Sequence, residues 1–111
     1  EMIDRLCIEA VEPAFNPGYP EDAQAILLVE VDGLVETVAE QAALVEELCR
    51  KHGTTDWRTA EDEAERETLW ASRKKALGAL GRLAPNYYLI DGVIPPTRLP
   101  ETMSKINALS D

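Results

Sequence analysis

The 111-residue sequence lacks a concentration of positive charge, because 11 lysines and arginines stand against 21 aspartates and glutamates. The resulting net charge of −10 makes nucleic acid a poor partner, since binding it requires a basic face that displaces counterions. No apolar run approaches the roughly 20 residues that a membrane-spanning helix needs, and no signal peptide is recognisable. We therefore expect a cytoplasmic protein without a transmembrane segment; association with a membrane through other subunits stays open.

Residues for metal-dependent and covalent chemistry are also scarce. Cys7 and Cys49 lie in two separate apolar helix patterns without CxxC spacing, which favours free thiols over a disulfide. His52 is the only histidine, and a single histidine cannot build a metal site or a serine-protease-like triad. Gly78 and Gly81 fall inside a helix pattern and form no phosphate-binding loop. We predict no metal site and no catalytic residue within the chain.

The length and the 45% apolar content indicate one small domain with enough apolar residues for a core. Apolar periodicity predicts helices at 1–11, 34–52, 61–83 and 99–109, with Pro13 ending the first of them. Apolar and β-branched runs predict strands at 25–31, 54–60 and 86–94, the first of them covered on both faces. This order fits either a small doubly wound sheet or a split, ferredoxin-like arrangement. The layout is unfinished, and sequence before Glu1 or after Asp111 could supply a fourth strand.

Arg73, Lys74 and Lys75 are the only three consecutive cations in this acidic chain. Two interpretations stay open for them. A guanidinium can hold a carboxylate through two charge-assisted hydrogen bonds, which would make Arg73 part of an anion site. Cations in the later turns of a helix also favour the negative end of its dipole, and composition alone favours this second interpretation.

The run LWASRKKALGALGRLAPNYYLIDGVIPPTRLPE, at 69–101, resembles the C-terminal (cap) domain of FAD-linked oxidases. The upstream segments IDRLCIEAVE, GYPEDAQAILLVEVDG and DEAERETLWASRK are similar to that family in the same order. The resemblance covers essentially residues 1–111 and is greatest to the flavin subunit of glycolate oxidase, alongside D-lactate and D-2-hydroxyglutarate dehydrogenases. It implies an α+β fold with a ferredoxin-like (split βαβ) half-sheet of about three strands and helices packed on it.

The resemblance also implies a function. Family members use FAD to oxidise a 2-hydroxy acid by hydride transfer to the flavin, and the cap domain helps to bind the substrate carboxylate. Arg73 matches the arginine of the family motif L-W-x-x-R, and Lys74 matches the basic position that follows it. We therefore expect Arg73 and Lys74 to be substrate-binding residues. Leu89 stands where 2-hydroxyglutarate enzymes carry a substrate-binding lysine, which implies a smaller substrate such as glycolate or D-lactate.

The family's FAD-binding domain and its histidine-rich segment are absent from residues 1–111, so the resemblance implies a fragment of a larger enzyme that is inactive on its own. Its partners would be a small 2-hydroxy acid, the remainder of the flavoprotein and other oxidase subunits. The alternative is a stand-alone, non-catalytic α/β module for ligand binding or dimerisation. Open strand edges favour pairing with another chain, so a homodimer of this chain is also possible.

Overall fold

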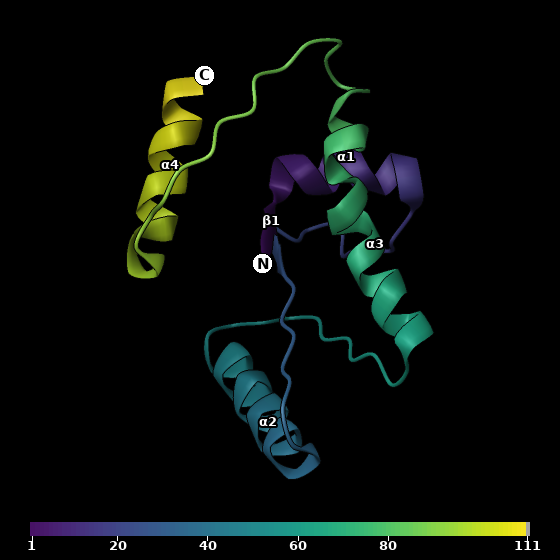
Figure 1. The fold of residues 1–111 in the computed structure, drawn as a ribbon. Coiled ribbons are helices and arrows are strands. Elements are labelled where there is room, and N and C mark those ends of the chain that lie inside the picture. Colours follow the sequence, from purple (N-terminus) through teal and green to yellow (C-terminus); the bar gives the residue numbers. More distant parts are fainter. Residues whose placement is uncertain (111) are drawn as a thin grey trace.

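The computed structural model describes residues 1–110 and contains four α-helices and one two-stranded antiparallel sheet (Figure 1). The expected α+β class is therefore confirmed. The expected half-sheet of about three strands is not, because only two strands pair within residues 1–110. In chain order the elements are β1 (Met2–Asp4), α1 (Arg5–Phe15), β2 (Ala25–Leu27), α2 (Val35–Lys51), α3 (Glu63–Leu80), the 3₁₀ turn η1 (Pro96–Arg98) and α4 (Leu99–Ser110).

The sheet pairs β1 with β2, with Ile3 opposite Ile26 at its centre. Two further hydrogen bonds, both 2.7 Å long, join the backbones of Glu1 and Leu28 and extend the ladder by one pair. The prediction of a helix from residue 1 is therefore wrong at its start, because residues 2–4 are held extended by β2. Asp4 then begins α1 as its N-cap, since its side chain accepts a hydrogen bond from the Cys7 backbone N–H at 3.1 Å.

The core lies where α1 packs against α3 (Figure 1). Three of the four buried residues in the cluster between these helices are alanines, and small side chains let the two helix backbones approach closely; Ile3 and Ile8 are buried as well. Val11 is the largest fully buried side chain among the described residues, with 0% exposure. Members of this cluster are Ala10, Val11, Ala76 and Ala79. The core is thus small and depends on one helix pair.

Pro13 lies inside α1 and does not end it, so the predicted stop is wrong. A proline inside a helix loses one backbone hydrogen bond and crowds the carbonyl four residues before it, and α1 ends two residues after Pro13. α1 ends at Phe15, followed by Asn16 in the left-handed conformation at φ 48°, whose N–H donates to the Glu12 carbonyl. The first helix therefore begins later and ends later than the sequence predicts.

The prediction for residues 34–52 is confirmed by α2, and the predictions for 61–83 and 99–109 by α3 and α4 with altered ends. No residue of α2 or α4 is buried, however. Figure 1 shows both helices standing apart from the α1–α3 pair. The apolar side of α2 consequently faces solvent, with Leu44 55% and Leu48 47% exposed.

Two predicted strands do not form within residues 1–110. Residues 54–60 form no strand, and Arg58 connects them to the loop after α1 by donating to the carbonyls of Pro17 and Gly18. Residues 86–94 are also unpaired, with Tyr88 98% and Val93 101% exposed. The predicted strand at 25–31 shortens to 25–27 and is not covered on both faces. In each case apolar composition favours a strand, but a strand requires a neighbour to satisfy its backbone groups.

Cys7 and Cys49 are both partly buried free thiols, and the sequence predicts free thiols rather than a disulfide. The helices found within residues 1–110 include none that is both long and apolar enough to cross a membrane.

Candidate functional site

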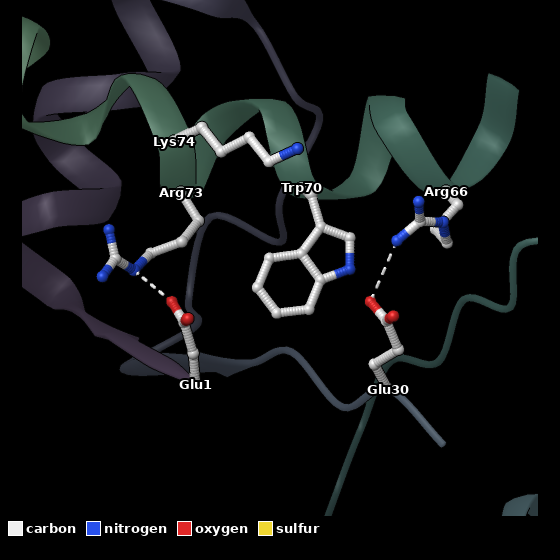
Figure 2. A pocket seen from close by; sticks show the side chains of 6 residues that line it. All are labelled: Glu1, Glu30, Arg66, Trp70, Arg73 and Lys74. Atoms are coloured by element: carbon white, nitrogen blue, oxygen red, sulfur yellow. Dashed lines mark hydrogen bonds and ion pairs between the residues drawn. The ribbon is translucent and has the colours of Figure 1, made fainter. Parts of the chain in front are cut away.

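An open cavity of about 260 Å³ lies beside α3, where the chain before β1 and the chain after β2 run past the helix (Figure 2). Its lining is strongly charged and includes a single aromatic ring. The lining residues, which we call the α3 pocket, are Glu1, Glu30, Arg66, Trp70, Arg73 and Lys74. Both predicted substrate-binding residues, Arg73 and Lys74, are therefore brought to the same cavity.

The α3 side chains of the pocket share one face of the helix because of their spacing. Trp70, Arg73 and Lys74 follow Arg66 by four, seven and eight residues, which is the repeat of neighbouring positions on a helix surface. α3 begins at Asp62, whose side chain accepts a hydrogen bond of 2.8 Å from the Glu65 backbone N–H. The neighbouring face of α3 packs on α1, so the pocket face is held toward the sheet.

The two carboxylates of the pocket come from the sheet end of the molecule. Glu1 precedes β1, and its backbone is paired with that of Leu28 just after β2. Glu30 lies two residues after Leu28. Antiparallel pairing therefore brings together two residues that lie 29 positions apart in the sequence. Each carboxylate reaches a different arginine of α3, as the dashed lines in Figure 2 show.

Arg73 holds a carboxylate through only part of its guanidinium. Its Nε lies 2.6 Å from Glu1 Oε2, and the side chains of the pair are 45% and 52% exposed. Within residues 1–110 Glu1 is the only carboxylate paired with Arg73, the two terminal nitrogens of Arg73 donate no hydrogen bond, and Lys74 makes no ion pair. Lys75 points elsewhere, with its Nζ 5.2 Å from the centre of the Phe15 ring. Of the three consecutive cations, Arg73 and Lys74 therefore line the pocket and Lys75 does not.

Arg66 is bound far more completely than Arg73. Its Nε and Nη2 donate to the two oxygens of Glu63 at 2.9 and 2.5 Å, and its Nη1 donates to Glu30 Oε2 at 3.1 Å. The hydrogen bond to Glu63 and the charges of Glu63 and Glu30 raise the pKa of Arg66. The same hydrogen bond lowers the pKa of Glu63. Arg66 is thus neutralised by its neighbours, whereas Arg73 retains free donors.

Sequence reasoning missed four of the six lining residues. The spacing of Arg66, Trp70 and Arg73 on one helix face was a usable signal for the first two. No local signal could have found Glu1 and Glu30, because only the pairing of β1 with β2 brings them to α3.

The other polar and aromatic features lie outside the pocket. Tyr87 and Tyr88 lie in the exposed segment 86–94, and His52 is exposed at the end of α2. Among residues 1–110, no group of three or more His, Cys, Asp or Glu residues is placed to hold a metal ion.

Comparison with known proteins identifies the family. Residues 1–111 match the family described as FAD linked oxidases, C-terminal domain. The chain is 48% identical over 110 residues to the glycolate oxidase subunit GlcD of Escherichia coli strain K12, a match that covers 99% of this chain and 22% of that protein. It is 33% identical over 110 residues to the glycolate oxidase subunit GlcD of Bacillus subtilis, covering 99% of this chain and 23% of that protein.

A third relative is the probable mitochondrial D-lactate dehydrogenase of Danio rerio, which is 32% identical over 110 residues, covering 97% of this chain and 22% of that protein. No solved structure matches the sequence significantly. The chain spans about a fifth of the length of these curated relatives. From its first residue to its last, the chain belongs to the FAD-linked oxidases and matches their C-terminal domain.

Proposed function

We propose that residues 1–111 form part of the cap domain of a larger FAD-dependent 2-hydroxy-acid dehydrogenase of the glycolate oxidase type. The substrate would be glycolate or D-lactate, as the names of the similar proteins suggest. In such an enzyme a flavin bound elsewhere in the protein would supply the redox chemistry. The contribution of this chain is to bind the carboxylate of the substrate and to orient it.

The residues described here do not fit a whole flavin dinucleotide. The α3 pocket has about 260 Å³, and a second cavity beside α4 has about 290 Å³, both below the range of roughly 300–1,000 Å³ typical of sites for drug-sized ligands. The chain also lacks a glycine-rich loop that could hold a diphosphate. We therefore assign FAD binding mainly to a different part of the flavoprotein and place no flavin contact on this chain.

The observation that carries the proposal is the state of Arg73. Its guanidinium already holds a carboxylate, that of Glu1, at 2.6 Å on the pocket side. Its two terminal nitrogens donate no hydrogen bond within residues 1–110 and form the fork that matches a second carboxylate in a bidentate pair. Lys74 lines the same pocket, with its ammonium on the side of Trp70 (Figure 2), and adds attraction for an anion without fixed geometry.

The exposed apolar segments support the larger assembly. Tyr88, Ile90 and Val93 are 98%, 86% and 101% exposed in the segment that sequence predicts as a strand. We propose that residues 86–94 pair with a strand elsewhere in the flavoprotein, which would complete a ferredoxin-like sheet. The exposed apolar sides of α2 and α4 would then pack on the remainder of the flavoprotein or on other oxidase subunits.

The test is steady-state kinetics of the complete flavoprotein with Arg73→Ala and Arg73→Lys. A charge-assisted hydrogen bond contributes about 1.5–3 kcal/mol, so losing the two bonds of a bidentate contact in Arg73→Ala should lower kcat/KM for glycolate by at least about 100-fold. Arg73→Lys keeps the positive charge but loses the two-pronged guanidinium, so its kcat/KM should lie between those of the wild type and Arg73→Ala. Arg82→Ala is the matched control, because Arg82 is an exposed arginine just beyond α3 and outside the pocket.

Unchanged kinetics in Arg73→Ala, or an equal loss in Arg82→Ala, would refute the assignment of Arg73. Flavin content and circular dichroism of each variant separate a binding defect from a folding defect. The half-exposed ion pair of Arg73 with Glu1 contributes little to stability, so the variant should fold.

A further inference from the structure

The α3 pocket carries a small net charge, although it holds three cations. Among the lining residues, Arg66, Arg73 and Lys74 are balanced in part by the carboxylates of Glu1 and Glu30, which leaves one positive charge; Glu63, which does not line the pocket, also pairs with Arg66. Such a balance suits a ligand with one negative charge. A second negative charge on the ligand would face a site with no remaining cation to compensate it.

Arg73 and Arg66 differ in how many of their guanidinium nitrogens are bound by carboxylates. Arg73 has a single partner at Nε, so its fork is available to a ligand. Arg66 is held by both oxygens of Glu63 and, from the pocket side, by Glu30 at 3.1 Å. Figure 2 shows the indole of Trp70 between the two arginines, with Glu30 reaching Arg66 across the pocket from the strand end.

We propose that Glu30 sets the charge preference of the α3 pocket. By neutralising Arg66 on the pocket side, it makes the pocket favour small 2-hydroxy monocarboxylates and discriminate against dicarboxylates. This inference rests on the proposed function, because it assumes that Arg73 holds the substrate carboxylate. It goes beyond that function by assigning specificity to a residue outside the L-W-x-x-R motif.

The expected effect follows from electrostatics over the short distances within a pocket. Glu30 is 51% exposed, so its charge acts through a dielectric between those of water and of a protein interior. Removing it would raise the net charge of the pocket from one to two positive charges and leave one donor of Arg66 without its partner. We expect an approximately tenfold gain for a dianion over a monoanion, equivalent to about 1.4 kcal/mol.

The experiment measures competitive inhibition of glycolate oxidation by the complete flavoprotein at neutral pH. Malonate serves as the dianion and acetate as the monoanion. In Glu30→Gln, the inhibition constant of malonate should fall about tenfold relative to that of acetate, and the gain should shrink at high salt. Glu36→Gln removes an exposed carboxylate from α2, outside the pocket, and should leave the ratio unchanged.

Two further variants make the outcome decisive. Glu63→Gln weakens the other contact of Arg66 and should shift the malonate-to-acetate ratio in the same direction, so it replaces Glu30→Gln if that variant does not fold. Arg73→Ala separates the two claims. If it leaves glycolate kinetics unchanged, the proposed function fails; if it impairs them while Glu30→Gln keeps the wild-type ratio, only the role of Glu30 is refuted.

Discussion

Val11 offers a direct test of the packing that supports the pocket, because it is the largest fully buried side chain at the contact of α1 with α3. Val11→Ala removes two buried methyl groups, worth about 1.6 kcal/mol at roughly 0.8 kcal/mol per group. A residual cavity of roughly 50 Å³ would add about 1 kcal/mol. The expected loss in the free energy of unfolding is therefore about 2–3 kcal/mol.

Urea unfolding of the 111-residue chain, followed by circular dichroism, measures this loss. With a typical slope of about 1–3 kcal/mol per molar urea, the midpoint should fall by roughly 1–3 M. Val35→Ala is the matched control, since it makes the same chemical change at an 83% exposed position and should shift stability by less than about 0.5 kcal/mol. An unchanged midpoint in Val11→Ala, or an equal loss in Val35→Ala, would show that the α1–α3 contact is not the stabilising core.

Two further predictions concern the thiol near the pocket and the unpaired segment. Burial and the neighbouring Asp4 raise the pKa of Cys7. In a Cys49→Ser variant, Cys7 should therefore react more slowly with a disulfide reagent at neutral pH than an unstructured thiol does. Equal rates would contradict this prediction. Because the folded-state pKa is the higher one, the stability that this thiol contributes is full below its unfolded pKa and is lost as pH rises through the folded value. Amide hydrogen exchange of residues 86–94 should be fast in the 111-residue chain and slow in the complete flavoprotein; fast exchange in both would refute the proposed strand pairing.

The helices were predictable because their signals are local. Leu34, Val38, Val45 and Leu48 recur at helical spacing, and α2 forms from Val35 to Lys51 even though it buries none of its residues. The strands were not predictable in the same way. Apolar residues at 86–94 are typical of a strand, but pairing depends on a partner that the sequence of the segment does not contain. β1 was missed because three residues carry almost no periodic signal.

Some residues of the α3 pocket were likewise predictable from the sequence, and others were not. Arg73 and Lys74 stand out as consecutive cations in an acidic chain, and the structure brings both to one cavity. Nothing in the sequence distinguishes Glu1 and Glu30 from the other acidic residues, of which the chain has twenty-one in total. Only the β1–β2 ladder gives these two a place opposite the arginines of α3.

The central claim is that Arg73 binds the carboxylate of a 2-hydroxy acid. A crystal structure of the complete flavoprotein, chemically reduced so that its flavin cannot accept a hydride and soaked with glycolate, tests it most directly. We predict that the glycolate carboxylate lies about 2.7–2.9 Å from the two terminal nitrogens of Arg73. Glycolate bound away from α3, with Arg73 still paired only with Glu1, would contradict the account.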